Sequence, residues 1–172
     1  MTSQTTLEPL SKDELRVLAS KAIEAKEYAY CPYSKFRVGA CVMLSDGTYH
    51  TGANVEVASS PVGICAERCA IAPIVASLKR PAMPVLRAIA VATDISPPAS
   101  PCGMCRQFIN EFASKDLPIY MYGKDGIDSE GENEDKDGSG GGGGGGGSGM
   151  VMMTIGQLLP MSFGRSDLGR DR

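Results

Sequence analysis

Two short motifs constrain this chain more than any other feature, because together they predict a metal site that the fold must assemble. The first is Cys65-Ala66-Glu67, and the second is Cys102-Gly103-Met104-Cys105. Three thiolates bound to a tetrahedral zinc ion leave one position open for water. Such a water ionises near neutral pH, and Glu67, two residues from Cys65, is placed to take its proton and pass it on. The pattern therefore predicts hydrolytic chemistry.

Cys69 leaves other interpretations open. It follows Cys65 by four residues, so four thiolates could form a closed structural zinc site with no place for water. A helix that begins at Cys65 would instead place Cys69 a full turn away, about 6 Å, where it would pack as a small apolar side chain. Cys102 and Cys105 could also form a redox pair, although that leaves Cys65 without a role.

Composition restricts the class of protein. The chain has 172 residues, of which 42% are hydrophobic, as is normal for one globular domain. We find no apolar stretch long enough for a membrane span and no signal-peptide pattern at residues 1–9, so we expect a cytoplasmic protein with reduced cysteines and no membrane partner. The net charge of -3, without clusters of Lys and Arg, also argues against a nucleic-acid partner.

Hydrophobic periodicity predicts an α/β fold. A capping box at Ser11–Glu14 begins a helix expected from about Lys12 to Glu27. Strands are expected at 37–44, 49–54, 87–93, 118–122 and 150–154, and the first two should form a hairpin. Two further helices, from about residue 64 and over 103–113, would each begin at one of the cysteine motifs, in a layered arrangement. Pro73 is expected to kink or break the first of these.

One domain is expected over residues 11–168, with flexible termini at 1–10 and 169–172. Residues 124–149 form an insert that is first acidic and then glycine-rich, a composition that does not support a packed core and predicts disorder. Loop-closure entropy grows slowly with length, so the fold can absorb this insert between two adjacent strands. We interpret it as a tolerated insertion, with a partner-binding arm as the alternative.

Further segments extend the pattern over most of the chain. They are Tyr30-Cys31-Pro32-Tyr33-Ser34, Phe36, Thr51-Gly52-Ala53-Asn54-Val55-Glu56, Gly63-Ile64-Cys65-Ala66-Glu67-Arg68, Ser100-Pro101-Cys102-Gly103-Met104-Cys105-Arg106-Gln107 and Leu158-Leu159-Pro160-Met161-Ser162-Phe163-Gly164. In this order they resemble the cytidine deaminase family of small, nucleoside-acting zinc enzymes. The resemblance implies a three-layer α/β/α fold with a five-stranded mixed sheet, one zinc ion per subunit and a homotetramer.

The resemblance also implies roles for single residues. Asn54 and Glu56 would hold the ribose 3′-hydroxyl, Phe36 would stack on the pyrimidine, and the backbone N–H of Ala66 would bind the carbonyl of the base. The complete set consists of the catalytic Glu67, the zinc ligands Cys65, Cys102 and Cys105, the substrate-binding residues Phe36, Asn54, Glu56 and Ala66, Arg68 beside the ligand sulfurs, and Tyr33 and Phe163 as contributions to a neighbouring subunit.

The implied reaction is deamination of cytidine and deoxycytidine to uridine and deoxyuridine in pyrimidine salvage. Zinc-bound hydroxide would attack C4, while Glu67 carries one proton to N3 and a second to the departing ammonia. Arg68 would draw charge from three thiolates that otherwise make zinc a poor Lewis acid. Ser60 departs from the family, which often has an aromatic residue there.

Two alternatives remain at this point. One is a deaminase of a nucleoside analogue or of cytosine in a polynucleotide, although a clamped 3′-hydroxyl leaves no room for a continuing chain. The other is a non-catalytic module stabilised by a closed four-thiolate zinc site.

Overall fold

The computed structural model describes residues 8–124, 126 and 149–169. Most of the predicted insert and both chain ends therefore lie outside the described residues. The elements are α1 (Lys12–Lys26), β1 (Val38–Leu44), β2 (Tyr49–Ala53), η1 (Ser60–Val62), α2 (Ala66–Ser77), β3 (Leu86–Thr93), α3 (Gly103–Phe112), β4 (Pro118–Tyr122), β5 (Met150–Thr154), α4 (Ile155–Leu158) and η2 (Arg165–Leu168).

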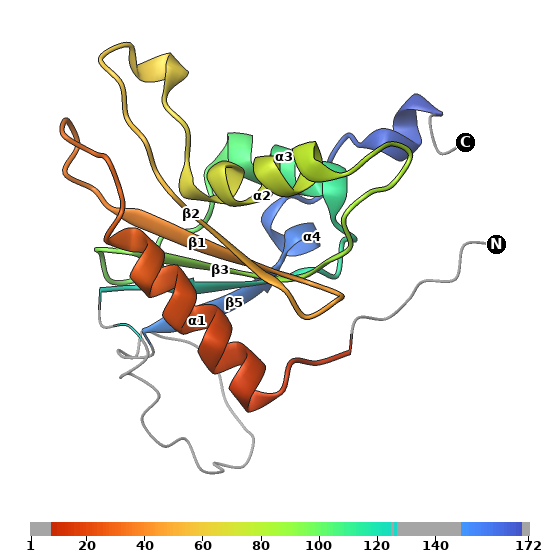
Figure 1. Ribbon diagram of the computed structural model, residues 1–172, viewed down its shortest axis with the longest axis horizontal. Coiled ribbons are helices and arrows are strands. Elements are labelled where there is room, and N and C mark those ends of the chain that lie inside the picture. Colours follow the sequence, from red (N-terminus) through yellow and green to blue (C-terminus); the bar gives the residue numbers. More distant parts are fainter. Residues whose placement is uncertain (1–7, 125, 127–148, 170–172) are drawn as a thin grey trace.

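The strands form the predicted five-stranded mixed sheet, in the order β2-β1-β3-β4-β5. Strand β1 pairs antiparallel with β2 and β3, β3 and β4 are parallel, and β4 and β5 are antiparallel. Helix α1 lies on one face of the sheet, and α2, α3 and α4 lie on the other (Figure 1). This is the three-layer α/β/α arrangement.

Side chains of the central strands alternate between two hydrophobic cores. Val42 and Ile89 belong to the core beneath α2, α3 and α4. Their neighbours Cys41 and Ala90 belong to the core beneath α1. Because successive strand residues point to opposite faces, a strand buried on both sides needs apolar residues on both, as β1 has throughout and β3 has from Ala88 to Ala92.

Two glycines allow helices to lie directly against the sheet. A Cβ atom at Gly39 would come within 2.9 Å of the Cα atom of Lys26 in α1, and one at Gly52 within 2.5 Å of the Ala66 carbonyl oxygen in α2. Backbone atoms at these distances do not move aside as a flexible side chain can. Gly52 therefore sets how closely the first turn of α2, which begins beside Cys65, approaches β2.

The predicted elements agree with the structure to within one or two residues. The capping box is present, because Ser11 accepts from the Glu14 backbone and the Glu14 carboxylate accepts from the Ser11 backbone. Of the two outcomes predicted for Pro73, the break is wrong, since α2 continues to Ser77, and the kink stays a prediction. Pro73 is exposed, whereas Ala70, Ile71 and Ile74 are buried in the core, and this burial offsets the lost backbone bond.

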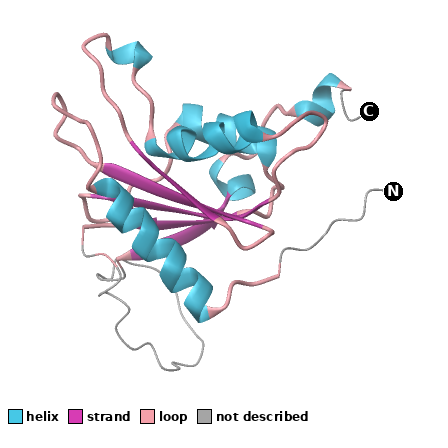
Figure 2. Ribbon diagram, viewed as in Figure 1, coloured by secondary structure: helices cyan, strands magenta, loops and turns pink. Residues whose placement is uncertain are grey.

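Two long loops, residues 27–37 and 54–65, project from the same end of the sheet (Figure 2). Single β-bridges join Tyr30 to Val55 and Val55 to Ile64. The loops are therefore fastened together beside the beginning of α2. In the described part of the chain, no helix combines the length and apolar character needed to cross a bilayer.

Replacing Gly52 with alanine is expected to lower the melting temperature, because the added methyl group meets backbone atoms of α2. The expected loss is roughly 3 kcal/mol, at the upper end of the usual cost of overpacking. Gly103→Ala is the matched control, since its Cβ would enter open space. Equal melting temperatures for the two variants, measured by thermal denaturation, would contradict this account of the packing.

Replacing residues 125–148 with a four-residue turn is expected to preserve the fold and bound zinc. The Gly123 N–H donates to the Gly149 carbonyl at 2.8 Å, so the ends of β4 and β5 are already paired. A roughly sixfold shorter loop should add up to about 1.6 kcal/mol to the free energy of unfolding. Chemical denaturation and zinc analysis of both proteins test this, and loss of zinc would show that the insert supports the site.

Candidate active site

Three cysteines form a group with the dimensions of a zinc site. Their Sγ atoms all lie within 4.8 Å of one another, and those of Cys65 and Cys102 are 3.8 Å apart. A tetrahedral zinc ion with Zn–S bonds of about 2.3 Å requires sulfurs separated by about 3.8 Å. Among the described residues no other group of three such side chains is present, and Cys69 does not join this one. The geometry disfavours a closed four-thiolate site.

Helix N-termini bring the sulfurs together. Cys65 is the N-cap of α2 and Cys102 is the N-cap of α3, while Cys105 lies in the first turn of α3. The free N–H groups and partial positive charge at a helix N-terminus stabilise thiolates. The prediction that both motifs open helices is confirmed.

The sulfurs lie close enough to form hydrogen bonds with one another. Hydrogen bonding with Cys105, followed by that from Arg68, lowers the pKa of the Cys65 thiol to about 5 despite its burial. The same bond with Cys65, together with burial, raises the pKa of the Cys105 thiol. A metal ion binds the deprotonated sulfurs, so its binding would release the protons that remain.

Arg68 lies directly beside this group. Its Nη2 atom donates to Cys65 Sγ at 3.6 Å, and this hydrogen bond raises the pKa of the guanidinium, which stays charged. Its Nε atom is buried without a partner among the described residues. A half-buried cation with a spare, buried N–H donor fits a site that gathers negative sulfurs around a metal ion.

A cavity of about 490 Å³ opens beside the sulfurs. It is lined by Ser34, Phe36, Val38, Asn54, Glu56, Cys65, Glu67, Val91, Thr93, Ala99, Ser100 and Cys102. Glu67 is only 3% exposed, and burial raises the pKa of its carboxyl group. The backbone N–H of Ala66 is in the first turn of α2, where the helix offers it no carbonyl partner.

Asn54 and Glu56 line the same cavity but are already engaged with nearby loops. The Asn54 side chain accepts from the Val38 N–H at 2.8 Å and donates to the Phe36 carbonyl at 2.9 Å. Glu56 accepts from the Ser34 hydroxyl and from the backbone N–H groups of Tyr33 and Ser34. These bonds, led by that from Ser34, hold the pKa of Glu56 below its ordinary value.

An ion cluster forms around Asp94, with Arg37 and Lys26. Asp94 follows β3 and accepts from Arg37 Nε and from Lys26 Nζ, both at 2.9 Å. Burial raises the pKa of Asp94, but the hydrogen bonds from these two cations outweigh it and leave the pKa below its ordinary value. The cluster joins α1 to the residue after Phe36.

Sequence reasoning missed part of the cavity wall. Val38, Val91 and Thr93 come from β1 and β3, and Ala99 and Ser100 from the loop before Cys102. No local sequence pattern marks the strand residues of this wall, because β1 and β3 come together only through strand pairing, which places Val38 opposite Thr93.

Tyr33 and Phe163 do not line this cavity. They are 61% and 60% exposed, respectively. Tyr33 and Ser60 instead line an adjacent cavity of about 430 Å³, which shares Ser34 and Glu56 with the first.

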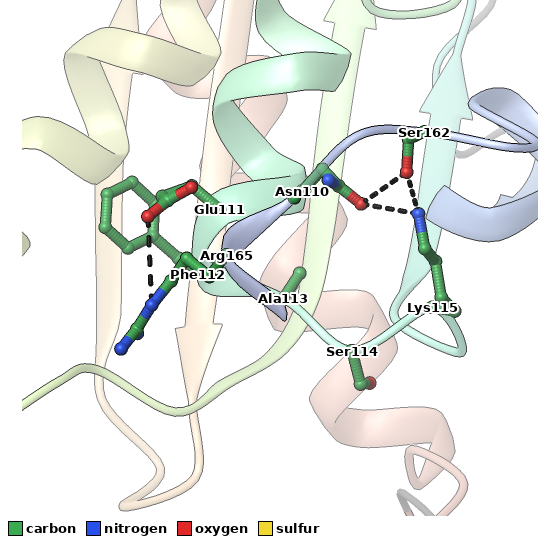
Figure 3. A pocket seen from close by; sticks show the side chains of 9 residues that line it. Asn110, Glu111, Phe112, Ala113, Ser114, Lys115, Ser162 and Arg165 are labelled. Carbon is green, nitrogen blue, oxygen red and sulfur yellow. Dashed lines mark hydrogen bonds and ion pairs between the residues drawn. The ribbon is translucent and has the colours of Figure 1, made fainter. Parts of the chain in front are cut away.

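A third cavity, of about 400 Å³, lies at the far end of α3 (Figure 3). Its polar groups pair among themselves, since Lys115 donates to Asn110 and Ser162, and Arg165 faces Glu111 at 3.9 Å. None of the predicted site residues lines it. The chemistry therefore belongs to the cavity beside the sulfurs.

Three cysteine thiolates lie at the beginnings of two helices, beside the buried carboxylate of Glu67. This combination of groups is typical of the active site of zinc-dependent deaminases. Residues 12–121 match the sequence profile described as "Cytidine and deoxycytidylate deaminase zinc-binding region". A cytidine deaminase from Sporosarcina psychrophila is 34% identical over 155 residues, covering 90% of this chain and 95% of that protein. One from Mycoplasma pneumoniae is 40% identical over 115 residues, 66% of this chain and 84% of that protein.

Solved structures agree with the sequence matches. The cytidine deaminase from Burkholderia pseudomallei has a TM-score of 0.68 at 31% identity, covering 90% of this chain and 100% of that one. That from Mycobacterium tuberculosis has a TM-score of 0.62 at 28% identity, covering 87% and 97%. This chain belongs to the cytidine deaminase family, and its three-cysteine group lies in the zinc-binding region of that family.

Cys102→Ala is expected to abolish zinc binding, because two thiolates do not complete the site, whereas Cys69→Ala should retain the metal. Elemental analysis of the two dialysed variants beside the unmodified protein measures this. If both variants lose zinc equally, the closed four-thiolate site is the better description.

Proposed function

We propose that this chain hydrolyses cytidine and deoxycytidine to uridine and deoxyuridine, releasing ammonia, in pyrimidine salvage. One observation carries the proposal: the buried Glu67 opens into the same cavity as Cys65 and Cys102. A carboxylate beside a three-thiolate site, outside the ligand set, is placed to move protons rather than to hold the metal.

Zinc, when bound by Cys65, Cys102 and Cys105, supplies a Lewis acid that makes a water molecule reactive near neutral pH. Glu67 removes a proton from the attacking water and delivers it to N3 of the base as the oxygen adds to C4. It then carries the second water proton to the C4 amino group, which leaves as ammonia when the C4–N bond breaks. Arg68 offsets the negative charge of the sulfurs through its bond to Cys65.

Asn54 and Glu56 are proposed to bind the ribose 3′-hydroxyl. Their existing hydrogen bonds determine which of the two donates to this hydroxyl and which accepts from it. Glu56 is ionised and only accepts, so the hydroxyl donates to it. Asn54 uses one amide hydrogen on Phe36, and its second amide hydrogen can donate to the same hydroxyl. The sugar is thereby recognised by one donor and one acceptor.

The base is proposed to lie between Phe36 and the beginning of α2. Phe36 lines the cavity, and Asn54 donates to its backbone carbonyl. Stacking on an aromatic ring favours a planar base. The Ala66 N–H, unpaired within the helix, donates to the carbonyl at C2 of the pyrimidine.

We further propose a cytoplasmic homotetramer, in which Tyr33 and Phe163 complete a neighbour's pocket. Both side chains are largely exposed in the single chain, and exposed aromatic residues are typical of protein interfaces. Gln107 and Asn110 donate to the Phe163 carbonyl at 2.9 and 3.2 Å, so α3 holds the segment that presents this ring.

Glu67→Gln is expected to retain the fold and zinc and to lose turnover of cytidine by about 10² to 10⁴ or more, because an amide does not shuttle protons. Ammonia release and bound zinc, measured on the same sample, test this. Glu24→Gln, an exposed change on α1 across the sheet, is the control and should retain full turnover. Near-normal activity of the Glu67 variant would refute its role.

A further inference from the structure

Arg106 follows Cys105 in α3 and is half-buried. All three nitrogens of its guanidinium donate hydrogen bonds. The Nε atom donates to the Pro101 carbonyl at 2.6 Å, and Nη2 donates to the Ser100 hydroxyl at 2.7 Å. The third nitrogen, Nη1, donates to the Leu158 carbonyl at 3.1 Å, at the end of α4. One side chain therefore connects the cysteine-bearing loop to two helices.

The residues just before Cys102 have little backbone support, although the Cys102 carbonyl itself accepts from the Arg106 N–H at 2.9 Å. Pro101 has no N–H group to donate, and the Ala99 N–H reaches Thr93 Oγ1 only at 3.5 Å. Cys102 is exposed, and as the N-cap of α3 it makes no side-chain capping bond. The short bonds from Arg106 are therefore major restraints on the position of the Cys102 sulfur.

We propose that Arg106 is a positioning residue for the metal site. Its helix carries Cys105, and its side chain holds the loop that carries Cys102. The guanidinium with its three hydrogen bonds, called the Arg106 fork below, thus fixes the separation of the Cys102 and Cys105 sulfurs before a metal ion binds. The inference rests on the proposed zinc chemistry, and it adds a residue that supports the ligands without touching the metal or the substrate.

The geometry of the fork, rather than its charge, carries this role. All three acceptors are neutral oxygens, two carbonyls and one hydroxyl. A planar guanidinium donates in several fixed directions at once, whereas the ammonium of lysine is a compact charge on a flexible stem. The bond to Leu158 also satisfies a carbonyl at the end of α4, which would otherwise lack a helical partner.

The test compares zinc affinity, by chelator competition, in the wild-type protein and in Arg106→Gln. Loss of support around metal ligands typically lowers affinity 10- to 100-fold, and we expect a decrease in this range. The cobalt-substituted variant should also show an altered absorption spectrum, because the sulfurs no longer hold their arrangement. Arg106→Lys should recover only part of the affinity. Full recovery by lysine would overturn the role of the fork.

Arg80 offers a matched control. Its guanidinium also donates to three backbone carbonyls, those of Leu78, Ala82 and Val75, at 3.1 to 3.2 Å. It lies beyond the far end of α2, about 18 Å along the helix axis from Cys65. Arg80→Gln is expected to lower the melting temperature while zinc affinity and the cobalt spectrum stay unchanged.

Equal zinc affinity in the two glutamine variants would overturn the proposal, because Arg106 would then act only on stability. If Arg106→Gln does not fold, Arg106→Lys decides in the same assay, and wild-type affinity in it refutes the inference. The affinity is measured without substrate. A wild-type protein that binds zinc but releases no ammonia from cytidine would therefore contradict the proposed reaction and leave the result for Arg106 intact.

Discussion

The meeting of two helix N-termini at one point is the constraint on which the rest of the site depends. Cys65 and Cys102 cap α2 and α3, and their sulfurs lie 3.8 Å apart. Thiolates at this distance repel one another, and the helix ends and the Arg68 guanidinium offset that repulsion. The close packing of α2 on β2, made possible by Gly52, brings one of these helix ends to its position.

The sheet provides a rigid base, but most polar residues of the site lie in loops. Those loops are fixed by side chains that bond to the backbone: Asn54 holds Phe36, Glu56 holds Tyr33 and Ser34, and Arg106 holds Pro101. A loop held in this way keeps its geometry without ladder hydrogen bonds. Asn54 and Glu56 also line the cavity, where they can meet a ligand.

The two faces of the sheet serve different purposes. The face beneath α1 holds an apolar core that includes Cys41, whose burial raises its thiol pKa to about 12 and keeps it protonated. The face beneath α2 and α3 carries the sulfurs and the cavity. Asp94 connects the two, because it binds Lys26 of α1 and also Arg37 beside the cavity.

The sequence by itself determined the strands, the helices and the identity of the three thiolates, because capping, alternation and ligand spacing act between residues that are near in the chain. Only the tertiary structure decided that Cys69 stays outside the sulfur group, that α2 continues through Pro73, and that Arg106 spans to Leu158. Only the tertiary structure also showed that Thr93 lines the cavity. The length of α2, the Arg106 bond and the place of Thr93 depend on contacts between residues that are far apart in the chain. The helical spacing of Cys65 and Cys69 left two arrangements open, and only the positions of Cys102 and Cys105 decided between them.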